Sequence, residues 1–132
     1  MIDQDDAFQF RATFQGAPQT IGHATTEEIA ALAGQVGVDA AHPLDDVLDS
    51  WSLVAIRSVS ATTVHALGWR RRLANTWITS KIVALSTTEG AVRTTSGAAY
   101  FLADPDQHEL HPKLRAHLIY ALTTWGYRDL RA

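Results

Sequence analysis

A run of short β-forming segments in the second half of the chain limits the possible folds more than any other feature. These segments are residues 52–59, 63–69, 76–86, 91–95 and 98–102. The links between them, such as Thr88-Glu89-Gly90 and Ser96-Gly97, are turn signals, and they are too short for the helical crossover that parallel neighbours need. We therefore expect an antiparallel meander of about five strands, with 76–86 as its longest strand.

The N-terminal segment adds a strand and a short partner for it. Apolar and polar side chains alternate from Phe8 to Gln15, which is the pattern of a half-buried strand. Gly16-Ala17-Pro18 ends this strand, and residues 19–23 are expected to return beside it.

Two short helices are expected next. Thr25 or Thr26 offers an N-cap hydroxyl, two glutamates favour the positive end of a helix, and apolar residues follow at helical spacing over 29–36. A second helix is expected over 43–48, because it starts with proline, which suits a first helical turn.

The C-terminal helix has the clearest signals. It starts at Pro112, carries one apolar stripe that includes Leu118 and Trp125, and stops at Gly126, which suits a left-handed C′ residue. The whole chain, residues 1–132, is predicted to be one α+β domain. Its meander forms an SH3-like barrel or an open sheet, with the N-terminal strand, the short helices and a C-terminal helix packed on the sheet.

Composition narrows the class of protein. The 132 residues suit one domain with a real core, and the absence of cysteine excludes disulfides, thiolate nucleophiles and Cys-ligated zinc. The N-terminus is acidic rather than basic, no apolar run follows it, and no stretch approaches the roughly 18 apolar residues of a membrane span. We expect a cytoplasmic protein with no membrane contact. No motif calls for a cofactor or a metal.

The net charge of −3 conceals an uneven distribution along the chain. Residues 1–50 hold nine acidic residues and one basic residue, whereas residues 51–100 hold six basic residues and one acidic residue. Residues 101–132 hold four of each sign. Such a distribution indicates an interaction surface if the two segments are displayed on separate faces. If the segments neutralise each other inside the fold, it indicates no interaction surface.

The sharpest local feature is the sequence Trp69-Arg70-Arg71-Arg72, with a further tryptophan shortly after it. Arginine forks bind phosphate or carboxylate at two points, and a flanking indole stacks on a base or a guanidinium. The alternatives are a solvated hairpin turn or neutralisation by the acidic segment. With the other basic residues of the expected sheet, the candidate binding residues are Trp69, Arg70, Arg71, Arg72, Trp77, Lys81 and Arg93.

The polar segment from Asp104 to His111 is the candidate for a dispersed catalytic site, through Asp104, His108, Glu109 or His111. Its two histidines are three residues apart and precede the helix, so they do not match the zinc-protease pattern. The alternative is a connector whose side chain caps the following helix. His65 and His117 are expected to be packed and hydrogen-bonded rather than catalytic.

Two segments resemble a signature of small bacterial proteins associated with phages and mobile elements. They are Ile78-Thr79-Ser80-Lys81-Ile82-Val83-Ala84-Leu85 and the segment from Val92 to Leu102, which contains Ser96-Gly97 and Tyr100. The resemblance implies a strand–hairpin geometry and an accessory gene of a phage, plasmid or genomic island. It implies no activity and no catalytic residue.

The expected function is a non-catalytic binding module, a small inhibitor or accessory protein of a mobile element that acts, in an anti-defence role, by covering a protein or nucleoprotein complex. Nucleic-acid binding by the basic sheet is the first alternative, and the dispersed enzyme site is the second. The oligomeric state is open, a homodimer included. All interaction hypotheses depend on the opposite charges being displayed rather than paired.

Overall fold

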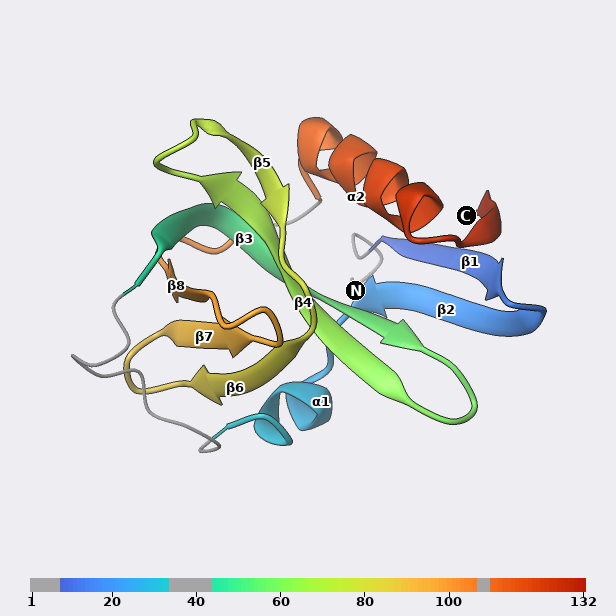
Figure 1. Cartoon of the computed structure of the whole chain (residues 1–132), viewed down its shortest axis with the longest axis horizontal. Coiled ribbons are helices and arrows are strands. Elements are labelled where there is room, and N and C mark those ends of the chain that lie inside the picture. The colour runs from blue at the N-terminus through green and yellow to red at the C-terminus, as the bar shows by residue number, and fades with distance from the viewer. Residues whose placement is uncertain (1–7, 34–43, 107–109) are drawn as a thin grey trace, which may run out of the picture.

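The strands and helices are defined by a computed structural model that describes residues 8–33, 44–106 and 110–132. Within these ranges the chain forms nine strands and two short helices (Figure 1). The elements in chain order are β1 (Gln9–Phe14), β2 (Ala17–His23), α1 (Thr26–Ala30), β3 (Asp46–Arg57), β4 (Thr62–Arg70), β5 (Asn75–Ile78), β6 (Ile82–Ser86), β7 (Ala91–Thr94), β8 (Ala99–Leu102), α2 (Pro112–Thr124) and β9 (Arg128–Arg131). No described helix has the length and apolar character needed to span a bilayer.

All strands belong to one open sheet, in which the order is β6-β7-β8-β3-β2-β1-β9 and β4 and β5 branch from β3. Every pairing is antiparallel except that of β3 with β8, which is parallel. The first residues of β3 pair with β8 and its last residues pair with β2, while β4 follows the opposite edge. β3 therefore joins the β6–β8 half of the sheet to the half that contains β1, β2 and β9 (Figure 1).

A bulge allows β3 to serve both halves. Its register with β4 shifts between Asp49 and Ser52, and Ser50 has a left-handed φ of 50°. Gly68 lies opposite this bulge, and a Cβ atom there would be 2.9 Å from the Asp49 carbonyl oxygen. Only glycine therefore permits this close approach of β4 to the bulged strand.

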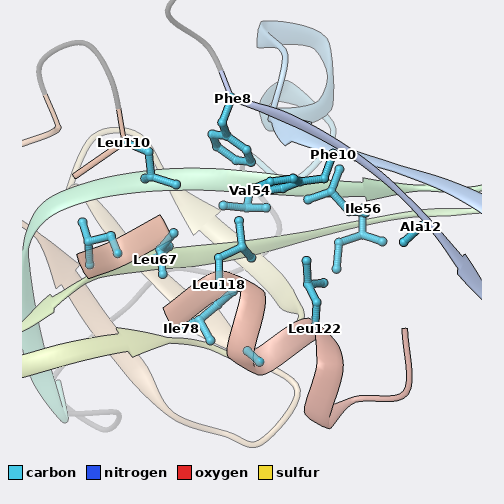
Figure 2. Packing of buried hydrophobic residues seen from close by; sticks show 13 residues of the cluster. Phe8, Phe10, Ala12, Val54, Ile56, Leu67, Ile78, Leu110, Leu118 and Leu122 are labelled. Carbon is cyan, nitrogen blue, oxygen red and sulfur yellow. The ribbon is translucent and has the colours of Figure 1, made fainter. Parts of the chain in front are cut away.

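The larger hydrophobic cluster lies between α2 and the sheet. Leu114, Leu118 and Leu122 of α2 are fully buried against side chains of β1 to β5, including Phe10 and Val54 (Figure 2). Burying side chains of this size contributes about 1.5–3 kcal/mol each. α2 is fixed on the sheet by this packing, and its Gly126 has the left-handed φ of 103° that ends the helix.

A second cluster lies on the other side of β3 and β4. It contains Leu48 and Leu53 of β3 and Val64 of β4, which pack with apolar residues of β6, β7 and β8. Strands that contribute to two clusters are buried on both faces, so they read as continuous apolar runs rather than alternating ones. This explains the unbroken buried run from Ser52 to Ile56.

Several sequence predictions are confirmed. Both N-terminal strands form, and Thr25 caps α1 in a reciprocal capping box with Glu28. The C-terminal helix begins at Pro112, and the turns before β7 and β8 are present. An α+β class with a mostly antiparallel sheet thus agrees with the structure.

Other predictions were wrong. The described part of the helix expected over 43–48 is an extended segment that leads into β3, because residues 46–48 pair with β8. The segment expected to be one strand over 76–86 forms two strands, β5 and β6. Between them, Thr79 donates its N–H to the Ala66 carbonyl, and its hydroxyl oxygen accepts the Ala66 N–H. In the described residues the segment expected to hold about five strands holds six, β3 to β8, and β9 was missed. Of the two forms left open by the sequence, the sheet is the open one and not the barrel. α1 stops at Ala30, and the end of the helix expected over 29–36 lies outside the described residues.

Candidate functional site

The arginine triplet lies at the turn between β4 and β5. Arg70 pairs with Asn75 at the end of the ladder, and the Leu73 and Ala74 N–H groups close the turn by bonding the carbonyls of Arg70 and Arg71. Leu73 is 53% exposed at the tip, and the Arg72 side chain is also exposed. The tip therefore presents one cation beside one apolar side chain.

Asp46 holds this turn from inside. It is 3% exposed, and its carboxylate accepts the Arg70 Nε–H at 2.9 Å and the Arg72 backbone N–H at 3.0 Å from each oxygen. It also accepts the Val47 N–H at 2.7 Å. Burial by itself raises the pKa of Asp46, but these donors outweigh burial and hold the pKa below its ordinary value. The carboxylate stays ionised and fixes the conformation of the turn.

Arg71 is also paired, but at the surface. Its guanidinium donates to both carboxylate oxygens of Asp49, at 3.0 and 2.7 Å. The Asp49 carboxylate raises the pKa of Arg71, whose side chain remains 59% exposed. Of the three arginines, Arg72 alone has no side-chain partner among the described residues.

The two tryptophans of the candidate site do not flank the arginines together. Trp77 lies opposite Gly68, and Trp69 lies opposite Thr76, so their side chains project from opposite faces of the β4–β5 pair. The Arg70 guanidinium lies 4.8 Å from the Trp77 ring centroid and occupies that face. Trp69 instead meets the start of α2, with its ring 5.6 Å from the His111 ring. The pair therefore does not form one stacking platform.

Lys81 and Arg93 lie in or next to other strands of the sheet than the arginine triplet. Lys81 precedes β6 and lines a cavity of about 450 Å³ with Glu28 and Leu32. Arg93 lies in β7 between Ala84 and Ala99 of the neighbouring strands, and its side chain is half-buried. Neither residue belongs to β4, β5 or the turn at residues 70–75.

The acidic and basic segments neutralise each other at three ion pairs in the described ranges. Besides the Asp46 and Asp49 pairs, Arg57 donates to both oxygens of Glu28 at 2.6 and 2.8 Å. The Arg57 guanidinium lowers the pKa of Glu28 to about 2, against the opposing effect of burial. The arginines at 57, 70 and 71 are therefore not available as free cations. Of the alternatives that the sequence left open, neutralisation by the acidic segment applies to Arg70 and Arg71, while Arg72 stays exposed.

The candidate catalytic segment is a connector where the structure describes it. His111 caps α2, with its Nδ1 atom accepting the Lys113 N–H at 3.1 Å, and Asp106 accepts the His111 N–H at 3.3 Å. The backbone carbonyl of Asp104 accepts the Trp51 N–H. His108 and Glu109 lie outside the described residues. In the described ranges, no group of three His, Cys, Asp or Glu side chains is arranged to hold a metal ion.

His65 and His117 are packed and hydrogen-bonded, as predicted. Nδ1 of His65 is 3.1 Å from the Thr79 carbonyl oxygen and Nε2 is 3.0 Å from the Thr63 hydroxyl, a pattern that suits the neutral tautomer with the proton on Nδ1. Burial lowers the pKa of both histidines. His117 contacts the Thr76 hydroxyl at 2.7 Å and so ties α2 to β5.

Sequence reasoning missed a second group of arginines. β9 lies beside β1 in the sheet, and Arg131 is the direct cross-strand partner of Arg11. The residues are 120 positions apart, and Arg128-Asp129-Leu130-Arg131 has almost no β-forming signal. The only local hint was that Arg11 stands on the polar face of the predicted N-terminal strand.

Comparison with known protein families, with curated proteins and with solved structures finds no match for this chain.

Proposed function

We propose that the protein is a non-catalytic binding module that covers a surface of a partner protein, and that the tip of the β4–β5 hairpin is its contact. The observation that supports this proposal most directly is that Asp46 fixes the turn through hydrogen bonds. A buried carboxylate that accepts the Arg72 N–H and the Arg70 side chain presets the loop conformation. A preset loop loses little conformational entropy on binding.

The chemistry of the tip defines the kind of surface it fits. Leu73 offers an exposed apolar side chain, and Arg72 beside it offers a guanidinium with no carboxylate partner in the described ranges. Arginine is enriched in binding hot spots, and burial of an exposed leucine side chain in a contact is favourable. We infer a partner with a shallow apolar depression bordered by carboxylates. The resemblance of residues 78–85 and 92–102 to proteins of mobile elements favours an inhibitor or accessory role.

The test is a capture experiment at physiological salt with tagged protein. Leu73→Ser and Arg72→Glu are compared with Val59→Ser, because Val59 is 96% exposed at the tip of the β3–β4 hairpin and provides a matched apolar control. We expect wild type and Val59→Ser to retain the same protein, and both tip variants to lose it. Equal retention by all variants, or no retained protein for any, would contradict the proposal.

A nuclease step distinguishes the main alternative. Binding of nucleic acid by the basic sheet would place phosphates on the arginine triplet, but only Arg72 of the triplet lacks an ionic partner in the described residues. Capture that disappears after nuclease treatment, with a steep dependence on salt, would favour nucleic acid and count against a protein partner.

A further inference from the structure

The face of the sheet opposite α2 carries a cavity of about 360 Å³ over β1, β2 and β9. Phe10 and Ala12 point towards α2, so Arg11 between them points the other way. The cavity is lined by Arg11, Ala12, Thr13, Pro18, Gln19, Thr20, Asp129 and Arg131. Two arginines and two threonines thus meet at a place that is built from both ends of the described chain.

The pairing register makes the two arginines direct cross-strand partners. Arg11 is directly opposite Arg131 on one side and directly opposite Thr20 on the other. Directly opposed residues lie on the same face with Cβ atoms about 4.5–5.5 Å apart, and like charges in this position destabilise a sheet. Neither arginine forms an ion pair with a carboxylate among the residues that the structure describes.

The one carboxylate that lines this cavity is held by a hydroxyl. The Thr13 hydroxyl donates to Asp129 Oδ2 at 3.1 Å. Asp129 has a left-handed φ of 56°, a conformation that aspartate and asparagine tolerate better than other side chains. Asp129 lines the same cavity as the two arginines, so its negative charge lowers the net positive charge there. It forms an ion pair with neither arginine in the described ranges.

We propose that this cavity binds a phosphate group, free or carried by a small phosphate monoester. Two opposed guanidiniums can each grip a separate edge of a tetrahedral oxyanion by two-point hydrogen bonds, whereas a planar carboxylate offers two oxygens to one fork. A dianion also relieves the repulsion between Arg11 and Arg131. Thr20, on the same face, supplies a further hydroxyl donor to an anion between the strands.

The experiment is a calorimetric titration of the full chain at low ionic strength with inorganic phosphate. Arg11→Gln and Arg131→Gln are each expected to weaken binding about tenfold or more, because each removes a charge-assisted contact. Arg128→Gln is the matched control, since it removes the same charge from the same strand but does not line the cavity. We expect it to bind phosphate within about threefold of wild type.

Asp129→Asn supplies a readout that misfolding cannot imitate. Asparagine keeps the shape, the acceptor for the Thr13 hydroxyl and the tolerance for a left-handed φ, but it removes a negative charge. We expect phosphate to bind several-fold more tightly to this variant. Unchanged or weaker binding by Asp129→Asn, or equal losses in Arg128→Gln and Arg131→Gln, would overturn the proposal.

Further ligands distinguish the source of the phosphate. Glycerol 3-phosphate that binds more tightly than inorganic phosphate indicates a monoester, and the reverse order indicates the free ion. Acetate tests the geometry and is expected to bind at least tenfold more weakly than phosphate. Acetate binding as tight as phosphate binding, or no detectable phosphate binding by wild type, would overturn the proposal.

Discussion

The arginines of the β4–β5 turn and the arginines of the β1–β9 pair differ in what surrounds them. At the turn, Arg70 and Arg71 each meet a carboxylate of the acidic segment, at 2.9 and 2.7 Å. At the β1–β9 pair, Arg11 and Arg131 are directly opposite each other on neighbouring strands. Two arginines of a dense run are thus neutralised by carboxylates, while two arginines far apart in the sequence become cross-strand partners with no carboxylate partner among the described residues. The density of charge along a chain is a poor guide to the charge that a fold displays.

The largest effect on stability is expected from removal of the buried carboxylate at the turn. Asp46→Ala leaves the Arg70 guanidinium and the Arg72 N–H without their acceptor. We expect it to lower the free energy of unfolding by about 3 kcal/mol, as for one partner removed from a buried pair. Urea denaturation measures the change.

Asp49→Ala is the matched control, because it removes the surface partner of Arg71 from the same strand. We expect a much smaller loss of stability, since exposed pairs contribute little. Equal losses in the two variants would show that Asp46 is no more structural than Asp49.

The pair between Arg57 and Glu28 gives a prediction of intermediate size. The pKa of Glu28 is lowered to about 2 in the folded protein, so its contribution to stability is present above its unfolded pKa near 4.5 and is lost as the pH falls towards 2. Solvent screening limits this contribution to about 1 kcal/mol. Glu28→Gln retains an oxygen for the capping box but removes the charge. We expect it to flatten the decline of stability between about pH 5 and pH 2 that wild type shows in urea denaturation.

A decline that is as steep in Glu28→Gln as in wild type would assign the acid sensitivity to other carboxylates. Glu27→Gln is the control for the charge change, because Glu27 is the neighbouring acid in the first turn of α1 and makes no ion pair in the described structure.

The smallest expected effect concerns the β1–β9 pair in the absence of phosphate. Arg131→Gln removes the repulsion with Arg11, so we expect it to raise the free energy of unfolding by a few tenths of a kcal/mol. Repeated thermal melts in a buffer without phosphate or sulfate measure the shift. A clear decrease instead would mean that Arg131 contributes favourable packing, and that opposing charges at this position do not strain the free protein.

Local signals in the sequence were sufficient for some elements. The alternation from Phe8 to Phe14 predicts β1 because this strand has one buried face. The capping box at Thr25 and the Pro112 start of α2 are local hydrogen-bonding and steric features, and they appear as expected.

The errors arise where distant pairing decides the structure. Residues 46–48 are extended because β8 offers them a parallel edge, which no local pattern reveals. β9 exists because β1 is beside it, although its own sequence is polar. The candidate site follows the same division, since the location of the arginine turn was predictable whereas its carboxylate partners and the β1–β9 pair depend on contacts between distant segments.

The bulged strand β3 has a consequence for how this chain can be divided. β3 and β4 together contribute side chains to the hydrophobic cluster under α2 on one face and to the cluster with β6, β7 and β8 on the other. Neither cluster therefore closes within a contiguous stretch of sequence. Two fragments cut in the loop between β4 and β5 would each lack a side of both cores, so we expect neither to fold alone and both to regain structure only when mixed.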